Sequence, residues 1–159
     1  MRMRLGFLLT AMLGLWSATA SGPVSAQAAA VTVTGAAEAI FPSGASFNGV
    51  PLKGLTLGQG LVIAEDGSAT GHFHAVLLGT SLLGIPQNIA VEGEIRDGSS
   101  AGTGSATFSG TATVDMGNGT PPTGGVPFWV TASATGVKLS LYTTELPTAS
   151  VSAGSITIE

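Results

Sequence analysis

The chain has 159 residues, contains no cysteine, and carries a charged side chain at only 9% of its positions. The lack of cysteine excludes disulfide bonds and thiol chemistry. Beyond residue 26, three cations (Lys53, Arg96 and Lys138) stand against nine acidic residues, so the net charge there is −6. A surface this poor in lysine and arginine cannot neutralise a phosphate backbone, which excludes nucleic-acid binding, and an anionic membrane would repel it.

The N-terminus has the three parts of a secretory signal peptide. Two arginines precede the uncharged run Leu5 to Trp16, and small residues follow it. The run has 12 residues, whereas a membrane-spanning helix needs about 20. We therefore expect residues 1–26 to be removed by cleavage after Ala26, with cleavage after Ala20 as the alternative. Residues 27–159 are then predicted to form a single domain, with no integral membrane segment, in the bacterial periplasm or at the cell exterior.

Alternating apolar and polar residues predict an all-β domain with almost no helix. Glycines interrupt every long window, and each interior glycine costs a helix about 1 kcal/mol. The clearest strand is 105–116, whose alternation places Phe108 and Val114 on a buried face. Residues 126–134 repeat the pattern, with Ala134 as the last inward position. The other expected strands are 30–38, 59–65, 69–78, 87–96, 137–143 and 153–159, with a less regular segment at 52–57.

Short connections predict that these strands, about eight or nine in all, form an antiparallel meander. Asp66-Gly67 and Asp97-Gly98 are typical of hairpin turns, and Gly136 alone separates two strands. An open meander leaves two exposed edges, which invite aggregation. We expect residues 31–34 to pair with residues 155–159 and close a small β-barrel, or the sheet to fold into a two-sheet β-sandwich.

The two histidines of the chain, His72 and His74, are both predicted to face water from one strand. If that strand and 87–96 form a hairpin, apolar residues must face apolar ones, so the numbers of paired residues have an even sum. A hairpin loop at residues 79–87 sets this sum at about 166 and gives the following pairs: Phe73 with Gly93, Ala75 with Val91, His74 with Glu92, and His72 with Glu94.

Two imidazoles and two carboxylates on one face suggest a divalent-metal site formed by His72, His74, Glu92 and Glu94. The alternative is a solvent-exposed ladder of His–Glu pairs, each contributing under about 1 kcal/mol. We favour the ladder, because a wet strand face offers no surrounding groups to hold the imidazoles in place.

Other catalytic patterns are missing from the sequence. It has no Gly-x-Ser-x-Gly elbow between a strand and a helix, no phosphate loop and no dinucleotide fingerprint. Glu92 and Glu94 are neighbours on one strand, whereas glycoside hydrolysis needs carboxylates opposed across a substrate. Residues 115–120 lack the spacing and the closing Glu of a calcium loop, so we interpret them as an Asx turn. We expect no cofactor and no enzymatic activity.

Two apolar features suggest binding instead. Residues 75–86 are unusually apolar for the end of a hairpin, and Trp129 and Tyr142 fall on outward faces of their strands. Such groups mark a partner surface unless a neighbouring loop covers them. The sequence therefore predicts an exported, non-enzymatic binding or structural module whose partner is a protein, a glycan or a small apolar ligand. The alternatives are a carrier with an apolar ligand inside a barrel cavity and a metal-dependent activity at the His72/His74 hairpin.

Overall fold

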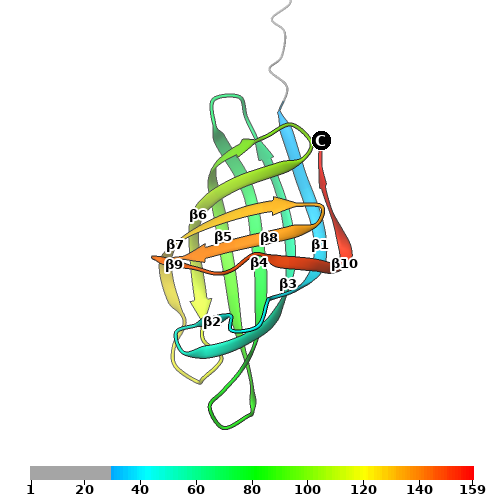
Figure 1. Cartoon of the computed structure of the whole chain (residues 1–159). Coiled ribbons are helices and arrows are strands. Elements are labelled where there is room, and N and C mark those ends of the chain that lie inside the picture. The colour runs from blue at the N-terminus through cyan, green and yellow to red at the C-terminus, as the bar shows by residue number, and fades with distance from the viewer. Residues whose placement is uncertain (1–29) are drawn as a thin grey trace, which may run out of the picture.

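The computed structural model describes residues 30–159, which form ten strands joined by turns and loops (Figure 1). The strands are β1 (Val31–Ile40), β2 (Ser46–Phe47), β3 (Val50–Ile63), β4 (Ser68–Thr80), β5 (Pro86–Ser100), β6 (Ser105–Asp115), β7 (Thr123–Ser133), β8 (Gly136–Leu141), β9 (Thr144–Glu145) and β10 (Ala149–Ile158). Their antiparallel pairing confirms the predicted all-β meander. No helix within residues 30–159 is long and apolar enough to cross a membrane. The expected signal peptide and its cleavage site lie outside the described residues.

Eight of the strands form a closed ring of hydrogen-bonded neighbours. The order around the ring is β1-β10-β8-β7-β6-β5-β4-β3, and β3 pairs again with β1. The first and last strands of the described region pair, which was one of the two expected ways to close the sheet: Val33 lies opposite Ile158 and Thr34 opposite Thr157. The ring is not a regular barrel, because β8 and β10 share only two residue pairs. In Figure 1, β7 and β8 cross in front of the steeper β3, β4 and β5.

β3 is one continuous strand of 14 residues, so the division expected between segments 52–57 and 59–65 is wrong. Gly58 does not interrupt it, because β3 has a partner on each side. Gly58 pairs with Ala36 of β1 and with His74 of β4. Two ladders of backbone hydrogen bonds outweigh the low strand propensity of a single glycine.

The prediction of a hairpin turn at Asp97-Gly98 is also wrong, whereas Asp66-Gly67 does form a turn. β5 runs through this dipeptide to Ser100, and the chain turns only at residues 101–104. A register shift between Ile95 and Asp97 marks an irregularity in the pairing of β5 with β6. The Gly98 amide donates a hydrogen bond of 2.9 Å to the carbonyl of Gly67. Gly98 therefore allows β5 to approach the turn at Gly67 closely and does not form a turn of its own.

The turn between β7 and β8 is Ala134-Thr135, and Gly136 is already the first residue of β8. Ala134, expected to face inward, is exposed because β7 ends at Ser133. The Ser133 hydroxyl accepts a hydrogen bond from the Gly136 amide and donates one to the Gly136 carbonyl, each 3.1 Å long. These side-chain hydrogen bonds take the place of backbone pairing between β7 and β8, so β7 ends one residue earlier than the alternation predicts.

The ring interior is filled by apolar side chains, and three phenylalanines form its aromatic centre. Phe73 packs edge-on against Phe108, with ring centroids 5.8 Å apart, and stacks on Phe128 at 5.6 Å. All three are 1% exposed or less. A Cβ atom at Gly93 would lie 2.6 Å from Cε1 of Phe128, so the bare backbone of β5 makes room for this ring. The inward faces predicted by alternation are thus packed tightly across the ring.

Candidate functional site

The hairpin of β4 and β5 has the predicted register. His72 lies opposite Glu94 and His74 opposite Glu92, and all four side chains are exposed. β6 extends both rows, with Thr111 beside Glu94 and Thr113 beside Glu92. These side chains border an open hollow of about 490 Å³, called here the His–Glu hollow. Its lining residues are His72, Phe73, His74, Glu92, Gly93, Glu94, Thr111, Ala112, Thr113 and Gly125.

The His–Glu hollow is a regular ladder of side chains. Opposed residues on paired strands have Cβ atoms about 5 Å apart, and same-face neighbours along a strand lie roughly 7 Å apart. Within residues 30–159, no group of three or more His, Cys, Asp or Glu residues is arranged to hold a metal ion. In that same part of the chain, the one ion pair joins Lys138 to Glu145, away from the histidines. The metal site stays a prediction that this geometry does not favour.

Residues 115–120 form two Asx turns, as interpreted from the sequence. The Gly117 amide donates to Oδ1 of Asp115 at 2.9 Å, and the Thr120 amide donates to Oδ1 of Asn118 at 3.0 Å. The oxygens that would bind calcium are thereby engaged by the local backbone.

A second hollow, of about 540 Å³, lies over β7, β8 and β9. Its lining residues are Trp129, Thr131, Lys138, Ser140, Tyr142, Thr143 and Glu145, which together are called the Trp–Tyr face. Trp129 and Tyr142 point outward as predicted and are 47% and 45% exposed. Trp129 pairs with Ser140, which pairs in turn with Glu145, so the row runs straight across three strands.

The Trp–Tyr face surrounds its aromatic rings with hydrogen-bonding groups. The Lys138 ammonium lies 2.8 Å from a Glu145 carboxylate oxygen, and both side chains remain accessible to solvent. Next to this pair, the hydroxyl oxygens of Thr131 and Thr107 lie 3.1 Å apart. An exposed ion pair of this kind contributes under about 1 kcal/mol to stability, so it is free to contact a ligand at little cost to the fold.

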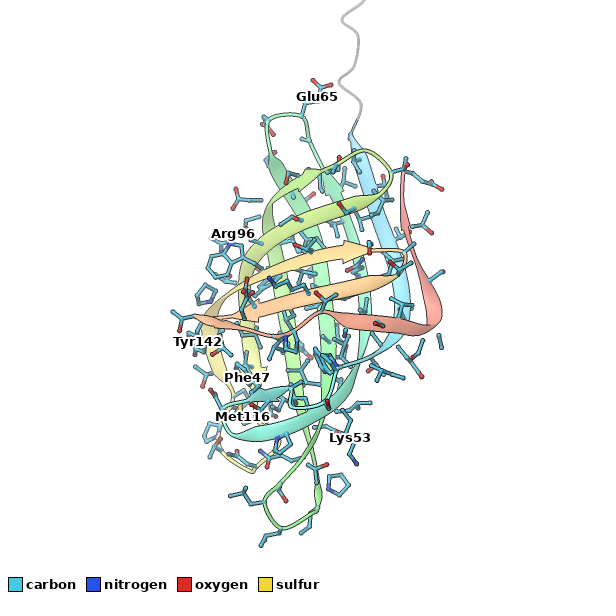
Figure 2. All side chains as sticks on the ribbon, in the orientation of Figure 1. Phe47, Lys53, Glu65, Arg96, Met116 and Tyr142 are labelled. Carbon is cyan, nitrogen blue, oxygen red and sulfur yellow. The ribbon has the colours of Figure 1, made fainter. Side chains whose placement is uncertain are left out.

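Tyr142 has a backbone conformation that the sequence did not suggest. Its φ is +53°, in the left-handed region that residues with a side chain rarely adopt. The Tyr142 amide donates a hydrogen bond of 3.0 Å to the carbonyl of Pro127, which holds the residue at the edge of β7. The bend leaves the Tyr142 side chain at the surface (Figure 2), where it lines the same hollow as Trp129. Strain of this kind clusters at functional sites, and it coincides here with the exposed aromatic pair.

Gln59 is the one buried polar side chain of the described core, and sequence reasoning also missed it. It lies on the inward face of β3 between Gly35 and Phe73, and it is 8% exposed. Neither Oε1 nor Nε2 has a hydrogen-bond partner. Burying an amide that has no partner costs roughly 1–3 kcal/mol, so an apolar side chain at position 59 is expected to stabilise the fold.

Within residues 30–159, no loop covers the apolar end of the β4–β5 hairpin. Leu82 is 94% exposed and Leu83 is 85% exposed, and Ile85 is also accessible. The sequence left open whether a neighbouring loop covers these side chains, and in the structure they are exposed.

In comparisons with known proteins, no family model, no curated protein sequence and no solved structure matches the chain.

Proposed function

We propose that the chain is an exported, non-enzymatic binding module that holds a neutral glycan on its Trp–Tyr face. The observation that carries the proposal is the pairing of two half-exposed aromatic side chains with hydroxyl, ammonium and carboxylate groups in one hollow. Exposed tryptophan and tyrosine are the residues that contribute most to binding surfaces, because they offer a large rigid area at a low entropy cost.

The chemistry of this face suits a sugar ring. The C–H groups on the flat side of a pyranose carry partial positive charge, which the negative face of an aromatic ring attracts. The ring hydroxyls both donate and accept hydrogen bonds, and they match the hydroxyls of Thr131 and Ser140, the Lys138 ammonium and the Glu145 carboxylate. The net charge of −6 beyond residue 26 disfavours polyanionic glycans, so the ligand is expected to be neutral.

Two features support binding on the outside of the ring over the carrier alternative. The phenylalanine cluster fills the centre of the interior, where a carrier would need a cavity. Both large hollows, by contrast, are open and lined mainly by outward side chains. The same arrangement supports a non-enzymatic role, because Glu92 and Glu94 lie side by side on β5 and face no opposed acid across the hollow.

Isothermal titration of the full chain with cellohexaose and chitohexaose tests the proposal. We expect saturable binding of at least one oligosaccharide, with Trp129→Ala weakening it at least about 10-fold. His72→Ala, in the other hollow, is the matched control and is expected to leave the affinity unchanged. If neither sugar binds, or if Trp129→Ala binds as well as the natural chain, the proposal is wrong.

A further inference from the structure

We propose that the tip of the β4–β5 hairpin inserts into a lipid surface with net-neutral headgroups. The tip consists of residues 81–85, called here the leucine tip. It forms a convex projection at one end of the molecule, opposite the end at which β1 begins and β10 finishes (Figure 1). Its exposed apolar groups are Leu82, Leu83 and Ile85.

The turn at the leucine tip does not itself require leucine. The Gly84 amide donates to the Ser81 carbonyl at 2.9 Å, the Ser81 amide donates to the Ile85 carbonyl at 2.8 Å, and Gly84 has a φ of +78°. Leu82 and Leu83 therefore occupy the two central positions of a tight turn, where Asn, Asp, Gly and Pro are usual.

The turn at the other end of β4 has the same backbone and the opposite chemistry. There the Gly67 amide donates to the Ala64 carbonyl at 3.0 Å, the Ala64 amide donates to the Ser68 carbonyl at 2.8 Å, and Gly67 has a φ of +84°. Its two central residues are Glu65 and Asp66. One turn geometry thus carries two acids at one end of the molecule and two leucines at the other, so the leucines serve something other than the turn.

The surroundings of the leucine tip favour a lipid surface. Residues 75–91 contain no charged side chain, so the hairpin end can enter an apolar layer without burying a charge. The nearest acids across or along the hairpin are Asp115, opposite Ala90, and Glu92. Glu92 lies six positions from Pro86, roughly 20 Å up the strand. Lys53 occupies the register shift beside Gly79 and is exposed near the same end, where its ammonium can reach a headgroup phosphate (Figure 2).

The size and shape of the leucine tip also fit lipid better than a protein partner. Three aliphatic side chains offer roughly a few hundred Å², well below the ~800 Å² that each partner buries in a stable protein interface. A convex tip needs no matching pocket when it enters hydrocarbon. The internal hydrogen bonds of the turn satisfy part of its backbone, as insertion requires. The acidic turn at the far end would then face water.

Sedimentation with phosphatidylcholine vesicles tests this inference on the full chain. We expect the natural chain to bind, Leu82→Ser to lower the partition coefficient at least about 5-fold, and Leu82→Ser with Leu83→Ser to lower it more than about 10-fold. Val62→Ser is the matched control, because it removes one exposed apolar side chain near the acidic turn. Its partition coefficient should stay within about 2-fold of that of the natural chain. All variants share the same N-terminal residues, so a difference between the leucine variants and the Val62→Ser control reports the tip.

Three results would overturn the inference: no binding to phosphatidylcholine, equal binding by the double serine variant, or binding that requires anionic lipid. Sedimentation velocity without vesicles separates a protein contact from lipid insertion. Self-association that depends on Leu82 and Leu83, without vesicle binding, would assign the tip to a second copy of the chain and contradict insertion.

Discussion

The two hollows on the outside of the ring have similar volumes and opposite chemistry. In the His–Glu hollow, the four titratable side chains of two histidines and two glutamates stand at the regular spacing of paired strands. In the Trp–Tyr face, one residue with a left-handed backbone, Tyr142, breaks that spacing and sets its ring in the same hollow as Trp129. The difference suggests that a regular ladder leaves side chains solvated, whereas a local irregularity gathers them into a site.

The largest expected effect comes from the core that carries both hollows. Phe128 stacks on Phe73 beneath the His–Glu hollow and directly precedes Trp129 of the Trp–Tyr face. We expect Phe128→Ala to lower the free energy of unfolding by about 3–5 kcal/mol, because it removes the contact between Phe128 of β7 and Phe73 of β4 and leaves a cavity. Trp129→Ala should lower it by under about 1 kcal/mol. Urea denaturation measures both, and equal losses would mean that Trp129 belongs to the core.

The protein should become more stable when the unpaired amide of Gln59, which lies inside the ring beside Phe73, is removed. We expect Gln59→Leu to raise the free energy of unfolding by about 1–3 kcal/mol, because Gln59 makes no hydrogen bond. The control is Gln87→Leu, because the Gln87 amide donates to the Met116 carbonyl at 3.0 Å. That change should lower stability by about 1 kcal/mol. A destabilised Gln59→Leu variant would show that the amide has a partner inside the ring, which would favour the carrier hypothesis.

Metal analysis sharpens the contrast between the two hollows. We expect protein purified without a histidine tag to contain no stoichiometric metal, because the His72 and His74 imidazoles stand in a solvated ladder. Elemental analysis of the natural chain and of His72→Ala measures this. A stoichiometric metal that disappears in the variant would mean that the His–Glu hollow closes around an ion.

The smallest effect concerns the acidic turn at the far end from the leucine tip. The Ser68 hydroxyl and amide donate to Oδ1 of Asp66 at 2.6 and 2.9 Å, and these bonds hold the pKa of Asp66 below its usual range. A lowered carboxylate pKa stabilises the fold above the pKa of the unfolded chain, and that contribution is lost as pH falls through the folded pKa. Ser68→Ala should therefore raise the pKa of Asp66 and slightly lower stability at neutral pH, with the difference vanishing in acid. An NMR titration that finds the pKa unchanged would contradict this.

The alternation of apolar and polar residues along each strand predicted much of the fold, because this alternation depends only on which side chains are buried. An even sum for apolar pairs, together with the expected loop at residues 79–87, placed His72 opposite Glu94. The need to close exposed edges gave the pairing of segments 31–34 and 155–159 as one of two alternatives, and the structure contains this pairing.

What the sequence did not predict depends on contacts between distant segments. Asp97-Gly98 has the composition of a turn, but its glycine is used for close approach to Gly67. The bend at Tyr142 depends on a hydrogen bond to Pro127, and no local pattern signals it. Gln59 lies at a core position of β3, where its neighbours and not its own sequence context bury it. The Trp–Tyr face was therefore visible as two outward aromatic residues, but not as one hollow.

Chemical-shift mapping during titration with the oligosaccharide that binds is the most direct test of binding on the outer face. We expect the largest changes at Trp129, Ser140 and Tyr142, with the amides of Phe73 and Phe108 unmoved. Changes concentrated at Phe73, Phe108 and Gln59 would place the ligand inside the ring and contradict the account.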